Sequence, residues 1–430
     1  MESKVKVVKD FYNREDISVQ SAGRKDTLIV DGEIISKRFM LITVSEAYEV
    51  YKNEIIEESV NISTFYQYRP RHIQLSSKTP HNMCVCIYHA NFGFLLEGCA
   101  KIIKSVPRNF QSFLQTICCS IEDENCMTNG CENCTKDLKN DIVPVAYLSK
   151  MNENVKWQHW RKVDDRIILT YTVAPLSEII HELEVQLPLF KQHFFVKRSQ
   201  QNYFESVKNN LRPGDLVLQI DFAENYRLIC QNEVQSAHFN YKQVTIFTCV
   251  AWMFDKTKSL AVISDSLNHS KIDVHLFIAK IVQEITHQHG NFQNIFLFSD
   301  GSSSQFKNKF IVWSLPDFLV QFGCKTVEWN YFATSHGKGA VDGVGAVIKR
   351  KIRQITKTKN IILSDAFSFF ECAQENITGI HSMYISDDAI NASSPTLMEK
   401  WKVIPNIPGI RKLHSISCDD HLKLKVAQTA

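Results

Sequence analysis

The feature that most constrains the fold is a series of apolar segments that begins after residue 214. Five segments have the length and the β-branched and aromatic content of buried strands, and three others repeat apolar residues at helical spacing. The predicted strands are 216–221, 243–254, 259–265, 294–300 and 326–332, and the predicted helices are 273–287, 305–318 and 341–355. The second of these segments is expected to be helical at least up to Pro316. The predicted order is three strands followed by helix, strand, helix, strand and helix.

This order is that of the ribonuclease H-like fold, in which helices flank a mixed five-stranded sheet. We therefore predict an α/β (mixed α+β) fold class, with the core in residues 215–360. The other predicted segments are a helical, helix-turn-helix-like region (1–80, with helices near 45–53 and 61–68), a Cys/His-rich module (81–140), a connecting helical region (141–214) and a C-terminal extension (361–430). An ordinary helical hairpin is the alternative for the first of these segments.

The composition limits the class of protein. The chain has 430 residues, of which 44% are hydrophobic and 22% charged, so several folded domains are expected rather than a disordered chain. The formal net charge of +3 argues neither for nor against nucleic acid. No run approaches the ~20 apolar residues of a membrane helix, and the N-terminus lacks the apolar stretch of a signal peptide. We expect a soluble, intracellular protein that is not secreted and has no membrane partner.

Three aspartates fall at the ends of predicted elements. Asp221 ends the first strand, Asp300 ends the fourth, and Asp342 opens the last helix. Packing alone gives no reason to gather like charges, but two Mg²⁺ or Mn²⁺ ions roughly 4 Å apart would relieve their repulsion and clamp a phosphodiester. Each aspartate alone is more often a capping or turn residue. Glu224 is a competing carboxylate if the chain turns back after Asp221.

Two of these aspartates stand in motifs that resemble those of a known family. FLFSDGSSSQF, around Asp300, resembles the second-aspartate motif of retroviral integrases and cut-and-paste transposases. GKGAVDGVGAVIKR, around Asp342, resembles their final motif, in which a Gly-rich loop precedes the third acidic residue and a Lys or Arg follows on the same helix. That family commonly places Glu at the third position, where this chain has Asp.

A longer resemblance covers nearly the whole chain. DFAENY, SDGSSSQFKN, WNYFATSHGKGAVDGVG, FYNREDIS and PNIPGIRKLHSI resemble segments of transposon-derived open reading frames that are abundant in invertebrate genomes. The resemblance implies a DDE/D-type nuclear enzyme, present in the cytoplasm before import, that cleaves DNA, joins its ends by 3′-hydroxyl attack and works as a homo-oligomer. The alternative is a domesticated or inactive copy that binds DNA without catalysis. A host ribonuclease with the same core is a more remote reading.

Basic residues surround Asp342 in the sequence. The predicted DNA-binding residues are His336 and Lys338 in the preceding loop, and Lys349, Arg350, Lys351 and Arg353 on the helix. A cationic helix face beside the acidic site would suit a DNA backbone without reading its sequence. An exposed loop and a solvated helix face are the alternatives.

The cysteines predict zinc because eight of the 13 lie between residues 84 and 134. The candidate ligands are Cys84, Cys86 and His89 in one half, and Cys119, Cys126, Cys131 and Cys134 in the other. Cys119 is preferred over Cys118 because of the family pattern, and Cys99 is expected to be a core residue. One structural zinc drawn from both halves is the first prediction. Two zinc ions, or free thiols without metal, are the alternatives.

Overall fold

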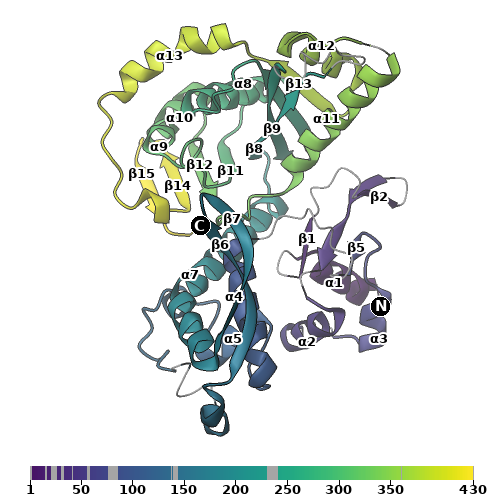
Figure 1. Ribbon diagram of the computed structural model, residues 1–430. Coiled ribbons are helices and arrows are strands. Elements are labelled where there is room, and N and C mark those ends of the chain that lie inside the picture. Colours follow the sequence, from purple (N-terminus) through teal and green to yellow (C-terminus); the bar gives the residue numbers. More distant parts are fainter. Residues whose placement is uncertain are drawn as a thin grey trace. The chain divides into compact units, whose positions relative to one another are not determined.

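The computed structural model describes residues 2–14, 17–20, 27–30, 33–40, 42–55, 59–75, 86–136, 138, 144–229, 241–359 and 361–429. The chain forms two compact units, residues 1–19 with 38–198 and residues 20–37 with 199–430, and the boundary falls within helix α7 (Leu176–Asn209). Both units combine helices with sheets (Figure 1). Among the described residues, none of the helices has the length and apolar content needed to cross a membrane.

The second unit is built on a mixed sheet of eight strands. These are β8 (Asp215–Arg227), β9 (Gln243–Met253), β10 (Lys256–Ser264), β11 (Asn294–Ser299), β12 (Thr326–Tyr331), β13 (Ile380–Tyr384), β14 (Ser415–Asp419) and β15 (Leu424–Ala427). Their order is β13-β10-β9-β8-β11-β12-β14-β15. β9 is antiparallel to β8 and β10, whereas β11 is parallel to β8 and β12. All five predicted strands are confirmed as elements, as is a mixed sheet with helices.

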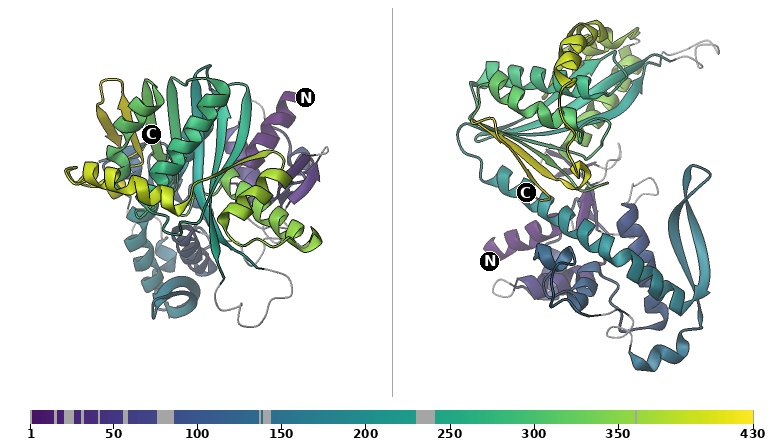
Figure 2. Two further views of the ribbon diagram at one scale, coloured as in Figure 1. Left: turned by 90° about the horizontal axis from the view of Figure 1, so that it is seen from above. Right: turned by 90° about the vertical axis from the view of Figure 1, so that its left-hand side faces the viewer.

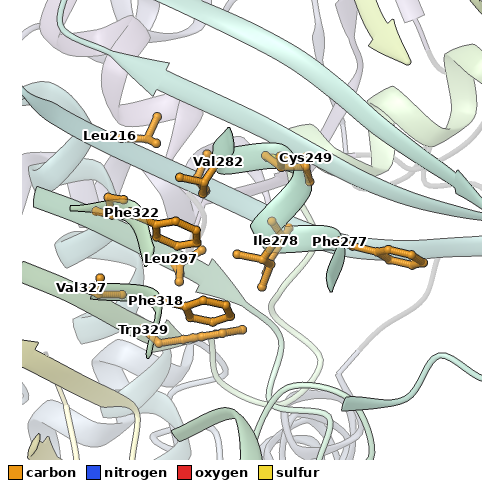
Figure 3. Packing of buried hydrophobic residues seen from close by; sticks show 14 of the residues in the cluster. Leu216, Cys249, Phe277, Ile278, Val282, Leu297, Phe318, Phe322, Val327 and Trp329 are labelled. Atoms are coloured by element: carbon orange, nitrogen blue, oxygen red, sulfur yellow. The ribbon is translucent and has the colours of Figure 1, made fainter. Parts of the chain in front are cut away.

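Helices cover both faces of this sheet. They are α8 (Lys271–His289), α9 (Lys309–Trp313), α10 (Leu315–Phe322), α11 (Ala340–Lys359), α12 (Ala366–Asn376) and α13 (Asp387–Trp401). Side chains alternate along β9, so that Phe247 and Cys249 pack with α8, α9 and α10, whereas Ile246 and Val250 pack with α11 and α12. Figure 3 shows the first of these cores, in which residues of the strands and of α8 and α10 lie against one another.

The helix predicted over 305–318 is divided shortly before Pro316. α9 stops at Trp313, and α10 begins at Leu315 with Pro316 in its first turn. A proline in this position removes an N–H that has no intrahelical partner, so a new helix can start there. The helix that we placed at 305–318 is therefore two shorter helices, and the second continues to Phe322.

The C-terminal extension completes the sheet instead of forming a separate segment. β13 adds to one edge in parallel with β10, and β14 adds to the other edge antiparallel to β12, followed by β15. These additions cover edges of the five-stranded core that would otherwise present unpaired backbone groups.

The N-terminal part of the first unit is largely helical, as predicted. It contains α1 (Glu2–Asn13), α2 (Val44–Glu54) and α3 (Ile62–Gln67), with short strands β1 (Ser18–Gln20), β4 (Arg38–Met40) and β5 (Ile73–Gln74). Tyr12, Tyr51 and Phe65 are fully buried at its centre. The two predicted helices are confirmed. A separate hairpin of β2 (Thr27–Val30) and β3 (Glu33–Ser36) belongs to the second unit.

The rest of the first unit is α4 (Ile87–Ile102), α5 (Phe110–Ile117), α6 (Glu124–Met127), β6 (Asn154–Val163), β7 (Arg166–Pro175) and the first part of α7. Its core includes Phe92 stacked on Phe190 and the buried Cys99, which confirms the prediction for Cys99. The predicted connecting helical region over 141–214 contains α7, but its first part is a long hairpin of β6 and β7 that was not predicted (Figure 2). Asp164 and Asp165 both have positive φ, which is the backbone of a two-residue hairpin turn.

Candidate functional site

The three predicted aspartates are brought to one region of the second unit. The parallel register between β11 and β8 pairs Phe298 with Gln219, and continuing it by two residues places Asp300 beside Asp221. Neighbouring strands lie about 4.8 Å apart. Asp342 stands in the first turn of α11, a helix that packs against β8 and β9. All three side chains are partly buried.

The proximity of the three carboxyl groups affects the pKa of Asp221. Burial, followed by the charges of Asp300 and Asp342, raises the pKa of Asp221 to about 8, against the opposing effects of the Phe222 N–H and the Lys338 charge. Burial also raises the pKa values of Asp300 and Asp342 above the ordinary carboxyl range. Gathering these groups without a cation therefore opposes their ionisation, and a bound cation would reverse that effect.

Backbone N–H groups hold one oxygen of each carboxylate. Phe222 N–H donates to Asp221 Oδ1 at 2.8 Å, and Ser302 N–H donates to Asp300 Oδ1 at 3.0 Å. Gly339 N–H donates to Asp342 Oδ2 at 2.8 Å. These donors come from the strand, the loop after β11 and the start of α11, so the orientation of each carboxylate is set by the local chain.

Glycines let the loop before α11 approach the aspartates closely. A Cβ atom added at Gly337 would lie 2.9 Å from Asp300 Cβ, and one at Gly339 would lie 2.5 Å from Gln219 Nε2. On α11 itself, a Cβ at Gly345 would lie 2.8 Å from Ala223 Cβ. Larger residues at these positions would separate the loop and helix from the strands that carry Asp221 and Asp300.

We expect Gly339→Ala to destabilise the second unit by about 1–3 kcal/mol, the usual cost of overpacking a closely packed site. The added methyl group meets Gln219, whose side chain is only 2% exposed and has little room to move. Equilibrium unfolding in denaturant measures the change. Gly343→Ala is the matched control, because nothing lies within 4 Å of its added Cβ and alanine favours a helix over glycine. Equal stability of the two variants would contradict this packing.

The predicted DNA-binding residues fall into different environments. Lys338 is exposed, and its charge lowers the pKa values of both Asp221 and Asp342, so it lies near the carboxylates. His336 is partly buried in the same loop, where its backbone N–H donates to Ala333 O. On α11, Lys351 and Arg353 are exposed and Arg350 is partly exposed. Lys349 is only 8% exposed and does not join that surface.

Glu224 lies apart from the three aspartates. β8 continues past Asp221 to Arg227, with an irregularity between Ala223 and Tyr226, and Glu224 is exposed on it. Glu224 is not among the groups that shift the pKa of Asp221. The chain does not turn back after Asp221, which was the condition for Glu224 to compete.

Sequence reasoning missed two buried residues in or next to the motifs that carry the aspartates. Gln219 faces the Gly-rich loop, and its amide donates to Gly337 O at 3.4 Å. Lys307 is 6% exposed and packs against Gly301, and burial lowers its pKa to about 8. Lys307 lies within the SDGSSSQFKN motif, and Gln219 lies two residues before the DFAENY motif. Their positions in and next to these motifs were the signal by which both residues could have been found.

The zinc candidates form two groups in the first unit, not one. The Sγ atoms of Cys119, Cys126, Cys131 and Cys134 all lie within 4.8 Å of one another, with 3.6 Å between those of Cys119 and Cys134. Cys86 and His89 lie in a different group. The prediction of one zinc drawn from both halves is therefore wrong, because each half gathers its ligands separately. Cys84 lies outside the described residues.

His193 is a further residue that sequence reasoning did not assign. It comes from α7 and approaches Cys86, with 3.3 Å between His193 Nε2 and Cys86 Sγ. The two residues are 107 positions apart in the chain, so no local spacing could connect them.

Known protein families match three parts of the chain. Three family models match, each described as a domain of unknown function: DUF8699 over residues 1–77, DUF8700 over 81–191 and DUF8701 over 200–430. No curated protein and no solved structure matches the chain. Because the third match covers more than half of the sequence, the chain belongs to the DUF8701 family.

Proposed function

We propose that this protein is a transposase-like, metal-dependent enzyme that cleaves DNA strands and transfers their ends. The observation that carries the proposal is the convergence of Asp221, Asp300 and Asp342. Burial and the charges of the other two acids together raise the pKa of Asp221 to about 8. Carboxylate oxygens are hard ligands that suit Mg²⁺ or Mn²⁺. A group of acids that resist ionisation without a cation fits the binding of such ions.

The strand order supports a ribonuclease H-like core as part of this proposal. The five central strands lie in the order β10-β9-β8-β11-β12, which is 3-2-1-4-5 when they are numbered along the chain. Only the second of them runs antiparallel to its neighbours. This order and these directions are those of the ribonuclease H-like fold.

In the proposed mechanism, Asp221, Asp300 and Asp342 would hold two divalent ions. Bound ions of this kind lower the pKa of water and stabilise the attacking and leaving oxygens of a phosphodiester. The backbone N–H groups of Phe222, Ser302 and Gly339 keep the carboxylates oriented. The Lys338 ammonium contacts a phosphate oxygen beside the acids, and the exposed cations of α11 bind the DNA backbone.

Nicking of supercoiled DNA by the full chain tests this function. We expect cleavage with Mg²⁺ or Mn²⁺ and none with EDTA. Asp300→Asn should lower the rate by about 10³-fold or more, since metal stabilisation of the transition state supplies several kcal/mol. Asp255→Asn is the matched control, because Asp255 is an exposed acid in the same unit and should leave the rate unchanged.

The enzyme proposal is contradicted if the wild-type protein binds DNA but cleaves it no faster than Asp300→Asn does with any of the cations. That result would favour a DNA-binding protein without catalysis. A homo-oligomer in the nucleus is the expected working form of the enzyme.

We also propose a structural zinc ion at Cys119, Cys126, Cys131 and Cys134. Burial opposes ionisation of Cys134, but hydrogen bonds from the Cys119 N–H and from neighbouring thiols lower its pKa below the ordinary thiol value. Four thiolates around Zn²⁺ carry a net charge of about −2. The buried cation Lys191 supports this site, because it lies beside Cys118 and donates to Asn129 at 2.8 Å.

A further inference from the structure

Cys86, His89 and His193 bring three metal-binding atoms together between two helices of the first unit. Cys86 caps the start of α4, and His89 lies within the first turns of that helix. His193 comes from α7, and its Nε2 is 3.3 Å from Cys86 Sγ. The rings of His89 and His193 have centroids 5.0 Å apart, and the potential ligand atoms of all three residues lie within 4.8 Å of one another.

Aromatic side chains enclose these residues. His89 contacts Phe110, Phe190 and Phe194 at ring-centroid distances of 5.5, 5.4 and 6.3 Å. His193 lies 4.7 Å from the ring of Tyr88 on its other side. Cys86 itself is 7% exposed. Aromatic neighbours of this kind lower the local dielectric, which strengthens the bonds of a cation to its protein ligands.

The chemistry of the three ligands indicates the class of metal. One sulfur and two imidazole nitrogens are ligands typical of zinc, not of Mg²⁺.

We propose that Cys86, His89 and His193 form a second metal site that binds Zn²⁺, separate from the four-cysteine site. The site would join the start of α4 to the middle of α7. The inference does not depend on the proposed enzymatic function.

Metal analysis of the purified full chain tests the site. Wild type should hold about two equivalents of zinc, and His193→Ala should hold about one, because three ligands become two. Cys131→Ala with Cys134→Ala should also hold about one equivalent. His193→Cys, which restores a ligand, should return the content toward two. His181→Ala is the matched control, because His181 is an exposed histidine of the same helix.

The zinc retained by His193→Ala reports whether the first unit still folds, since the four-cysteine site lies in that unit. Cobalt substitution gives a second readout, because a site with one sulfur and a site with four sulfurs have different charge-transfer spectra. The proposal would be overturned if wild type holds one equivalent that His193→Ala keeps and the double cysteine variant loses.

Discussion

Asp221→Asn is expected to stabilise the metal-free protein at pH 8 by about 2–4 kcal/mol while it removes DNA cleavage. Burial and the charges of Asp300 and Asp342 raise the pKa of Asp221 to about 8 in the folded chain. In the unfolded chain the same carboxyl group titrates near 3.9. Each unit of difference is worth about 1.4 kcal/mol, and partial exposure of the side chain reduces the total that should be observed.

The direction of the pH dependence follows from proton binding. Between pH 4 and 8, the folded state holds a proton on Asp221 that the unfolded state has released. The free energy of unfolding therefore falls as the pH rises through this range and levels off above about 8. Asparagine cannot ionise, so the variant should lose this part of the pH dependence. At pH 4 its free energy of unfolding should differ little from that of wild type.

Denaturant unfolding at pH 5 and pH 8 in EDTA measures this effect, with Asp255→Asn as the exposed control. Mn²⁺ should stabilise wild type at pH 8 because it binds the ionised carboxylates, and it should stabilise Asp221→Asn much less. The shared-site interpretation fails if Asp221→Asn is less stable than wild type at pH 8 without metal. It also fails if Mn²⁺ stabilises both proteins equally.

The second large effect is expected from the four-cysteine site. Cys134→Ala should lower the melting temperature of the first unit by more than about 10 °C and abolish zinc binding at that site. Structural zinc contributes about 10–16 kcal/mol of apparent binding free energy in small domains, and a loss of a few kcal/mol shifts a melting temperature by this amount. The segment around α5 and α6 has short helices, so such a crosslink would stabilise it.

Calorimetry with hydrogen exchange separates this effect from general destabilisation. Amides of α5 and α6 should lose protection in Cys134→Ala, whereas those of β8 and β9 in the second unit should keep it. Cys372→Ala is the matched control, because Cys372 is a buried thiol in α12 that belongs to neither zinc group. If chelated wild type melts at the same temperature as the zinc-bound protein, the ion has no structural role.

Much of the second unit could be predicted from the sequence because its signals are local. Runs such as 243–254 and 294–300 are apolar over the length of a strand, and these strands are β9 and β11 in the structure. Asp300 and Asp342 were identifiable because each stands at an element boundary inside a distinctive motif. The hairpin of β6 and β7 was missed because an Asp-Asp turn is a weaker signal than Asn-Gly, and exposed residues such as Ile167 blur the alternation.

The sequence by itself determined the five central strands, the three aspartates and the four closely spaced cysteines, because residues near one another in the chain produce these patterns. The tertiary structure decided that residues after 361 cover both edges of the sheet, that Gln219 supports the Gly-rich loop and that His193 joins Cys86. These contacts join distant parts of the chain. They form only when the burial of whole strands and helices compensates the entropy of closing long loops, and no local pattern encodes that balance.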